Sequence, residues 1–220
     1  MTPLTGQNII DKFETYTGDT SELSSEDELD LANKIYRAVC NDRPWEWLKK
    51  TATGIVGVSN GIATASVPSD FKYFVENDQA TDIAQGVHNN ASPKVIFLAT
   101  TSGYFHAYQI VNFSDRRQFL NQAGYAYFDA VNNQIVFTAI PTETDLSYEF
   151  DYICSPAPLT TNSSPVFHAD YHDIIFHGMV LDDLAIQLFD RTHSYQAENL
   201  KSYTDLLSQL RYQNAQLQMQ

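Results

Sequence analysis

The densest group of side chains able to bind a metal or transfer protons lies between residues 168 and 177. It contains His168, Asp170, His172, Asp173 and His177. Imidazoles and carboxylates are ligands of zinc and related ions, and residues four apart on a helix project from one side. No ligand-rich loop accompanies the group, and acids at a helix start or histidines at an interface account for the same residues. We therefore favour a structural role and expect no metal and no cofactor.

Two pairs of carboxylates are candidates for glycoside hydrolysis. They are Asp182 with Asp183 and Glu149 with Asp151. That reaction requires two carboxyl groups facing each other across a cleft at a defined separation. Adjacent residues on a helix diverge, so solvated acids are the favoured interpretation.

Nucleophilic and nucleotide chemistry find little support in the sequence. Ser69-Asp70 and Ser114-Asp115 lack the Gly-x-Ser-x-Gly elbow, and Cys40 and Cys154 lie far apart outside any Cys-x-x-Cys pattern. Gly54-x-x-Gly57 lies in a hairpin pattern and is not followed by the Gly-Lys-Ser/Thr of a phosphate-binding loop. We expect buried reduced thiols, no catalytic residue and no enzymatic activity.

Aromatic residues alternate in two segments, Tyr104 to Tyr108 and Tyr125 to Phe128. Such a row stacks on sugars when it is exposed, but in strands it more often fills a core or an interface. We favour the core.

The chain is acidic, with 13 Lys+Arg against 27 Asp+Glu and a formal net charge of −14. Gripping nucleic-acid phosphates requires clustered positive charge, which excludes a dedicated DNA-binding module. A channel through which DNA slides should hold phosphates weakly, so the composition is compatible with a DNA conduit. No stretch is apolar enough to span a bilayer, and the first residues lack a secretory pattern, so we expect a cytosolic product and no membrane contact.

The elements that must position these residues begin with helices. Apolar spacing predicts a helix over residues 8–17, ended by Gly18. Ser25-Glu26-Asp27-Glu28 fits a capping box that starts a second helix, which ends at Asp42-Arg43-Pro44. A short aromatic segment, residues 45–48, follows.

The middle of the chain is typical of strands. Asn60-Gly61 is a favoured hairpin turn between residues 55–58 and 62–67, and Asn132-Asn133 is a second tight turn. Further strands are predicted at residues 71–76, 94–100, 104–111, 125–131, 134–139 and 146–153. Two polar stretches, 77–93 and 112–124, are long for loops without a function.

Helices return after a proline-rich connector at residues 155–169. Asp170 is predicted to cap a helix that runs to about residue 190. A break near residues 192–194 separates it from a last helix over residues 195–216. Because helices flank the strands, we expect an α+β fold in which a helical bundle from both chain ends carries an inserted antiparallel β sandwich or barrel-like domain. The predicted parts are residues 1–53, 54–154 and 155–220, the last packing on the first.

Three segments stand in a recognisable order along the chain. They are Arg43-Pro44-Trp45-Glu46-Trp47-Leu48, Val67-Pro68-Ser69-Asp70-Phe71, and residues 148–159 followed by the connector and residues 171–189. The second is similar to a Leu-Pro-x-Asp-Phe segment, and the third looks like a last strand leading into a closing helix. Over nearly its whole length the chain resembles the head-to-tail adaptor proteins of tailed phages, including the tail tubular A type of short-tailed phages.

The resemblance implies a structural virion protein at the head–tail junction, made in the host cytoplasm. Identical subunits, commonly twelve, form a ring below the portal protein, and a tail, nozzle or stopper protein attaches on the other side. DNA passing through the channel touches the ring transiently and without sequence specificity. In a closed ring each subunit needs two different complementary surfaces.

The expected contact residues fall in two groups. The last helix is expected to be an arm that orders on the portal, so deletion of residues 195–220 is predicted to block docking. Its portal or ring contacts are Tyr195, Leu200, Tyr203, Leu207, Leu210 and Tyr212. The long loops are expected to face the tail through Asp78, Asp82, His88, Asp115, Arg116 and Arg117.

Two alternatives remain open. One is another virion component, such as a tail-completion, stopper or fibre-attachment subunit, which would also lack catalytic motifs. The other is a carbohydrate-binding or hydrolytic module, which the aromatic strands and the carboxylates would suit. Glycan binding and turnover assays distinguish the second from an adaptor.

Overall fold

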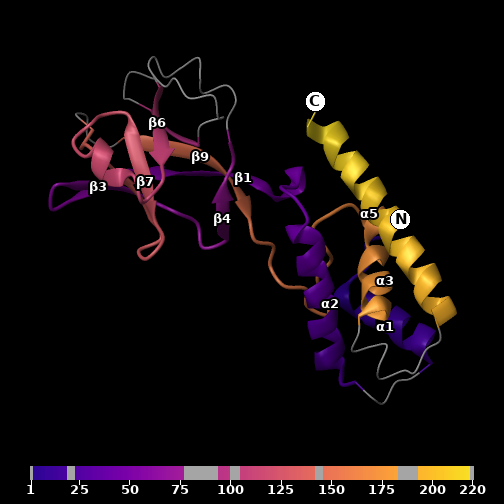
Figure 1. Cartoon of the computed structure of the whole chain (residues 1–220). Helices are drawn as coiled ribbons and strands as arrows, with labels where there is room; N and C mark the ends of the chain where they lie inside the picture. Colours follow the sequence, from indigo (N-terminus) through magenta and orange to yellow (C-terminus); the bar gives the residue numbers. More distant parts are fainter. Residues whose placement is uncertain are drawn as a thin grey trace. The chain divides into compact units, whose positions relative to one another are not determined.

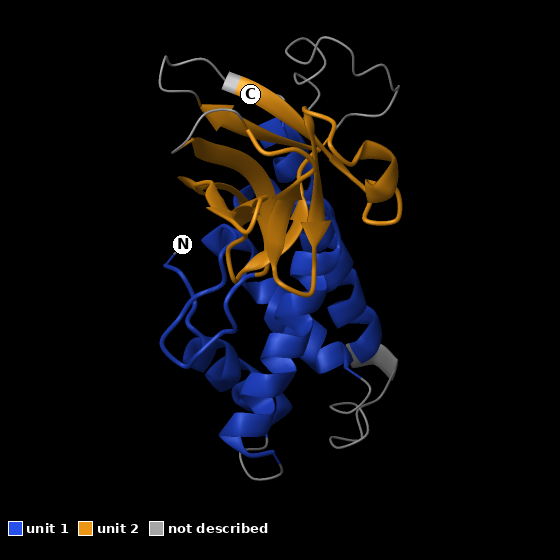
Figure 2. Ribbon diagram, turned by 90° about the vertical axis from the view of Figure 1, so that its left-hand side faces the viewer, with its two compact units in different colours: residues 1–48, 156–220 blue, residues 49–155 orange. Residues whose placement is uncertain are grey.

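Helices from both ends of the chain and strands from its middle form two units in a computed structural model (Figures 1 and 2). The structure describes residues 2–18, 23–76, 94–99, 105–141, 146–182 and 193–218. Residues 1–48 with 156–220 make up the helical unit, and residues 49–155 make up the β unit. The predicted fold class, α+β with a barrel-like sheet inserted between two helical chain ends, is confirmed.

The first two helices start at capping boxes. Helix α1 (Gly6–Thr17) is capped by Thr5 and Asn8, and it ends at Gly18 in the left-handed conformation (φ 69°), as predicted. Helix α2 (Ser25–Asn41) is capped by Ser24 and Asp27, one residue before the predicted Ser25 and Glu28. Either serine has an acid three residues later, so the local pattern fits both. The choice of Ser24 turns Glu28 into the interior, where its residue is only 2% exposed.

The aromatic segment after α2 closes one end of the helical unit. A short 3₁₀ helix, η1 (Glu46–Leu48), follows Trp45, whose side chain is completely buried. The Trp45 indole N–H donates to the backbone oxygen of Val39 at 2.8 Å, and the ring stacks on Trp47 with centroids 4.3 Å apart. A buried indole whose N–H has a hydrogen-bond acceptor combines a large apolar contact with a hydrogen bond.

The closing helices differ from the prediction in their boundaries. His168 caps a 3₁₀ turn, η4 (Ala169–Tyr171), and α3 (Asp173–Leu181) begins later than the predicted cap at Asp170. Helix α3 ends at Asp182, whose backbone is extended, and therefore does not continue to residue 190. Residues 183–192, where the break was predicted, lie outside the described part of the chain. The last helix is α5 (His193–Gln218).

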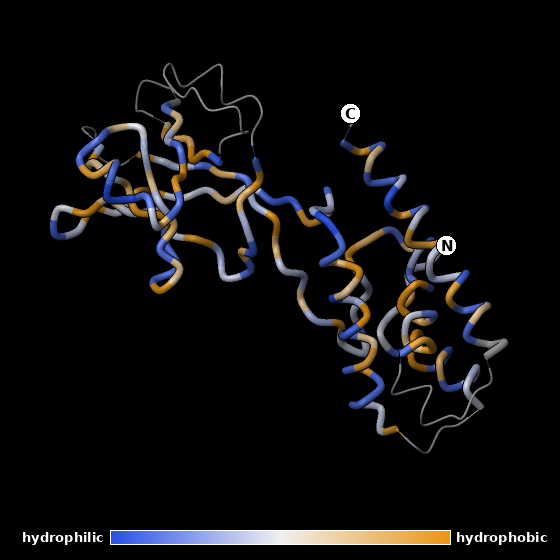
Figure 3. The backbone as a smooth tube through the Cα atoms, in the orientation of Figure 1, coloured by the Kyte–Doolittle hydropathy of each residue, from blue (hydrophilic) through white to orange (hydrophobic). Residues whose placement is uncertain are grey.

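Helix α3 forms the centre of the helical unit, where it contacts α1, α2 and α5. Six of its nine residues are Ile, Phe, Met, Val or Leu, which agrees with its hydropathy colouring (Figure 3). Six of the nine residues are buried. Helices α1 and α2 instead have one apolar face each. A helix that is apolar on every side requires partners on every side, and only helices from both chain ends supply them.

The β unit is one twisted sheet that nearly closes on itself (Figure 1). Its strand order is β1-β9-β5-β6-β7-β8-β3-β2, and β4 pairs with β9 beside this path. The strands are β1 (Lys49–Ile55), β2 (Gly57–Ser59), β3 (Ile62–Ser66), β4 (Phe71–Phe74), β5 (Val95–Ala99), β6 (Phe105–Val111), β7 (Tyr125–Asp129), β8 (Gln134–Phe137) and β9 (Ser147–Cys154).

Both predicted tight turns are present. The β2–β3 hairpin turns at Asn60 (φ 51°) and Gly61 (φ 77°), and Asn133 (φ 48°) precedes β8. Strand β1 begins at Lys49, before the predicted start near Gly54. Residues 49–53 carry no apolar alternation of their own, and their strand conformation follows from pairing with β9, where Thr51 lies opposite Asp151.

One strand pair departs from the antiparallel expectation. Strands β6 and β7 run parallel, with Gln109 opposite Tyr125. A tight turn cannot connect parallel neighbours, and a crossover of about a dozen residues is needed. Residues 112–124 provide it and contain a 3₁₀ helix, η3 (Arg116–Phe119). This long loop, which was expected from the sequence to face the tail, is therefore also part of the sheet topology.

Candidate interaction surfaces

The histidines and acids of residues 168–177 serve separate structural contacts. The backbone N–H of Leu4 donates to Nδ1 of His172 at 3.0 Å, and Nε2 of the same ring lies 2.9 Å from the Phe167 oxygen. An imidazole that accepts at Nδ1 and donates at Nε2 is neutral. Burial also lowers the pKa of His172 below its ordinary value, since burial disfavours the charged ring. His172 thus joins the amino-terminal segment to the connector.

The remaining members of the group have other partners. His177 donates from Nδ1 to Asn199 Oδ1 at 2.8 Å, and the Asn199 amide donates to the Tyr16 hydroxyl at 2.9 Å. His168 caps the turn at Asp170, and Lys12 pairs with Asp173 at 2.7 Å. Within the described residues, no group of three or more His, Cys, Asp or Glu side chains could hold a metal ion.

Three of the four candidate hydrolytic carboxylates lie in the described residues. Asp182 pairs with Lys34 of α2, while Asp183 lies outside the described residues. In β9, Glu149 is exposed and Asp151 accepts a hydrogen bond from the Thr51 hydroxyl at 2.7 Å. Cys40 and Cys154 are both buried and neither forms a disulfide, in agreement with the expectation from the sequence.

Asp70, of the Ser69-Asp70 pair, joins three strands of the β unit. It accepts from Lys50 Nζ at 2.7 Å and from the Tyr152 hydroxyl at 2.9 Å. Its backbone oxygen also accepts the N–H of Ser155 at 2.7 Å. The contacts with Lys50 and Tyr152 outweigh the effect of partial burial and lower the pKa of Asp70, whereas burial and this neighbouring carboxylate raise the pKa of Tyr152 to about 12.

The aromatic side chains of these strands pack against other aromatic rings of the β unit and are partly buried. Phe71 and Phe74 contact Phe128 with centroids 5.1 and 5.7 Å apart, and Tyr108 meets Phe137 edge-on at 5.2 Å. Residues 100–104, including Tyr104, lie outside the described part of the chain. These contacts agree with the core interpretation and differ from an open stacking platform.

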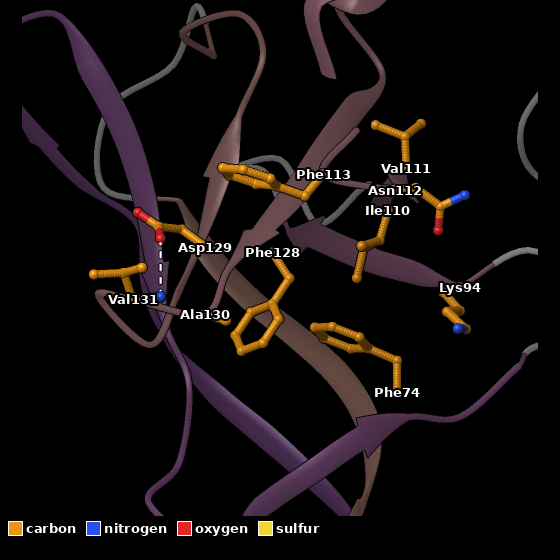
Figure 4. A pocket seen from close by; sticks show the side chains of 10 residues that line it. All are labelled: Phe74, Lys94, Ile110, Val111, Asn112, Phe113, Phe128, Asp129, Ala130 and Val131. Atoms are coloured by element: carbon orange, nitrogen blue, oxygen red, sulfur yellow. Dashed lines mark hydrogen bonds between the residues drawn. The ribbon is translucent and has the colours of Figure 1, made fainter. Parts of the chain in front are cut away.

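A pocket opens at one end of this aromatic interior (Figure 4). Its volume is about 390 Å³. Its walls are mainly apolar, and Lys94 and Asp129 are the charged residues among those that line it. The Asp129 carboxylate accepts from the Val131 N–H at 3.1 Å and from the Asn132 amide at 2.7 Å, and the latter contact lowers its pKa. The lining residues are Phe74, Lys94, Ile110, Val111, Asn112, Phe113, Phe128, Asp129, Ala130 and Val131.

Helix α5 is anchored on the helical unit at several points. The backbone N–H of Glu46 donates to Asn214 Oδ1 at 2.8 Å, and Asn214 is only 2% exposed. Arg211 forms two hydrogen bonds with the Asp42 carboxylate, which lower the pKa of Asp42. Leu210 is completely buried. In the described structure α5 therefore packs on the helical unit at these points, and its expected docking on the portal stays a prediction.

The predicted contact residues of α5 divide accordingly. Leu210 faces the interior, and Tyr203 and Leu207 are partly buried, so their side chains have limited access to a partner. Leu200 (54% exposed) and Tyr212 (68%) remain available, and the sequence analysis missed exposed Leu217. Tyr195 lies in the helix, but its side chain is outside the described structure.

Of the residues expected to face the tail, the crossover residues can be placed. Arg117 is exposed, and Arg116 stacks over the Phe113 ring at 3.6 Å. Asp115 precedes η3 and accepts a hydrogen bond from Ser114. Asp78, Asp82 and His88 lie outside the described residues, as does the whole stretch 77–93. Phe113 and Leu120, which were not among the predicted contact residues, are the large apolar residues of the crossover that are exposed.

The sequence could not have shown the pocket or the two buried asparagines of α5, Asn199 and Asn214, because each depends on segments far apart in the chain. No helix in the described part of the protein is long and apolar enough to cross a membrane.

No curated protein matches the chain. A family model described as SU10 adaptor protein matches residues 4–220.

Proposed function

Because this chain belongs to the SU10 adaptor protein family, we propose that it is a structural subunit of a tailed-phage virion that joins the portal to the tail. The observation that carries the proposal is the match over residues 4–220, which includes both units and the connector between them. It agrees with the order of the three sequence segments that resemble head-to-tail adaptors. The finer resemblance to the tail tubular A type is part of the proposal.

The contacts of the ionisable residues support a structural role. His172, Asp70 and Asp42 each connect segments that are far apart in the sequence, and their hydrogen-bonding positions are occupied by the protein itself. Residues used in this way stabilise a scaffold and leave few groups to act on a substrate. We propose that the protein is not an enzyme and requires no cofactor.

The proposed assembly is a ring of identical subunits, twelve in number, at the head–tail junction of the virion. The portal protein contacts the exposed residues of α5, with Tyr212 and Leu200 as its main anchors. A tail, nozzle or stopper protein contacts the β unit at the crossover, where Leu120 and Arg117 are exposed. The net charge of −14 supports a channel in which DNA is touched only transiently.

The test combines the purified full chain with the portal protein of the same phage and images the mixture by negative-stain electron microscopy. We expect a second ring stacked on the portal.

Deletion of residues 195–220 is a poor test, because it also removes buried Leu210 and Asn214. Tyr212→Asp changes an exposed side chain and should weaken portal binding about tenfold or more.

A matched control is Ser208→Asp, which adds the same charge at another exposed position of α5. It should bind the portal like the wild-type protein. Absence of any ring on the portal would overturn the adaptor assignment. Equal portal binding by Tyr212→Asp and Ser208→Asp would instead move the contact away from Tyr212.

A further inference from the structure

The β2–β3 hairpin exposes large apolar side chains within an uncharged segment. Residues 54–67 contain no charged side chain, although the chain has 40 charged residues in all (13 Lys+Arg and 27 Asp+Glu). Three large aliphatic side chains of this segment are exposed, Ile55 by 61%, Val58 by 56% and Ile62 by 51%. A cluster of exposed apolar side chains without charges marks a contact surface more often than a solvated one.

The exposed side chains lie on both faces of the hairpin. Val58 is opposite Ala63 and Ile62 is opposite Ser59 in the antiparallel register. Cross-strand partners share a face and neighbours along a strand alternate, so Val58 and Ile62 point to opposite sides. A hairpin that only covered the core of its own unit would need apolar side chains on one face.

The outer edge of the hairpin is also open. Strand β2 is the last strand of the sheet path, and within the described residues it pairs only with β3. Proteins usually protect such an edge with charged side chains or proline. Residues 57–59, Gly-Val-Ser, offer neither, so this edge can also receive a partner's backbone.

The pocket of Figure 4 is the complementary feature on the same unit. It is concave and mainly apolar, and the carboxylate of its one acid, Asp129, is already engaged by the turn at Val131 and Asn132. It lies away from the hairpin: Val58 pairs near the start of β3, whereas Asn133, which follows the pocket residues, bonds to Val67 beyond the end of β3. A chain therefore cannot place its own hairpin in its own pocket.

We propose that the hairpin of each copy of this chain docks in the pocket of the next copy. The inference rests on the proposed function and identifies the contact between neighbouring subunits. Copies with a net charge of −14 repel each other, so a contact between them is favoured where neither surface carries a net charge. The hairpin has no charged residue, and the pocket has one cation, Lys94, and one acid, Asp129. The hairpin and the pocket are two different surfaces, as a closed ring with head-to-tail contacts requires.

Disulfide cross-linking of the full chain tests this contact. The double variant Val58→Cys/Val131→Cys places one thiol on the hairpin and one at the pocket rim, where Val131 is 92% exposed. Both native cysteines are buried, so they interfere little. On the portal and under mild oxidation, the double variant should give a ladder of covalent oligomers on a non-reducing gel. Each single variant should stay monomeric on the gel. The proposed contact brings residue 58 of one copy to residue 131 of the next, and it brings no residue close to the same residue of another copy.

A second variant tests the contact without cross-linking. Val58→Asp/Ile62→Asp adds charges to the hairpin and should reduce ring occupancy on the portal at least tenfold, with an unchanged far-UV circular dichroism spectrum. Val166→Asp is the control, because Val166 is 48% exposed but belongs to the helical unit. It should leave the rings intact.

The outcomes separate the inference from the function on which it rests. Rings on the portal without a Val58–Val131 ladder would overturn the hairpin contact and leave the adaptor role standing. A dimer of the Val58→Cys single variant would also overturn it, because it would indicate a two-fold contact. If the wild-type protein forms no rings on the portal, both proposals fail.

Discussion

Gly178 of α3 lies so close to Ile35 of α2 that a Cβ atom added at position 178 would be 2.4 Å from Cγ2 of Ile35. The same Cβ would lie 3.2 Å from the Tyr203 ring of α5. Three helices from the two chain ends therefore meet at one glycine. Glycine disfavours a helix interior, so its presence here is explained by the close approach of the helices.

Substitution Gly178→Ala is expected to destabilise the protein by about 1–3 kcal/mol, because overpacking outweighs the gain of up to about 1 kcal/mol in helix propensity. Thermal unfolding followed by circular dichroism measures the change. Gly57→Ala is the control, since its Cβ would be 3.7 Å from the nearest atom, and it should change stability little. Equal melting temperatures for Gly178→Ala and the wild type would show that α2 and α3 separate readily.

The carboxyl group of Glu28 gives stability a dependence on pH. Burial, together with Glu14, Asp11 and Asp27 nearby, raises the pKa of Glu28 from 4.5 to about 7. Between pH 4.5 and about pH 7, Glu28 is ionised in the unfolded chain but still protonated in the folded chain. Folding stability therefore decreases as pH rises from about 4.5 to about 7, and no further contribution arises above that range.

Glu28→Gln should remove this contribution and raise the stability measured at pH 8 relative to the wild type. Urea unfolding at several pH values measures the difference, which should shrink toward pH 4.5. Glu26→Gln is the control, because Glu26 lies on the same helix and is exposed. A difference between Glu28→Gln and the wild type that is the same at all pH values would contradict the raised pKa.

His172 contributes in the opposite direction. Burial lowers its pKa below 6.5, so the unfolded chain binds a proton that the folded chain excludes. Its contribution to stability is complete above about pH 6.5 and is lost as pH falls below that value. In the Glu28→Gln variant, this loss of folding stability below about pH 6.5 should become measurable by urea unfolding. His172→Gln should be less stable than its parent at pH 8, because glutamine does not reproduce both bonds to Leu4 and Phe167.

Asn214 holds the end of α5 through the backbone N–H of Glu46. Asn214→Ala removes the acceptor and leaves a partly buried N–H without this partner, at a cost of about 1 kcal/mol. Hydrogen exchange should show faster exchange in the last turns of α5 and at Glu46. Gln216→Ala, at an exposed position of the same helix, should leave exchange unchanged. Unchanged protection in Asn214→Ala would show that Leu210 and the Asp42–Arg211 pair suffice to hold the helix.

The sequence determined those features that depend on a few neighbouring residues. Gly18 ends α1 because it adopts a left-handed conformation at little cost, and Asn60-Gly61 turns the hairpin for the same reason. Apolar periodicity distinguished helices from strands, and the order of these elements gave the fold class. These signals are local, so no knowledge of distant partners was needed.

Tertiary structure decided everything that depends on which distant segments meet. Ser24 and Ser25 are equivalent caps until packing buries Glu28, and residues 49–53 become a strand only because β9 lies beside them. Asn199 and Asn214 resemble surface residues in the sequence, yet they hold α5 through Tyr16, His177 and the backbone of Glu46. The hairpin is a contact candidate only in combination with the pocket, and the pocket forms where β4, β6 and β7 come together.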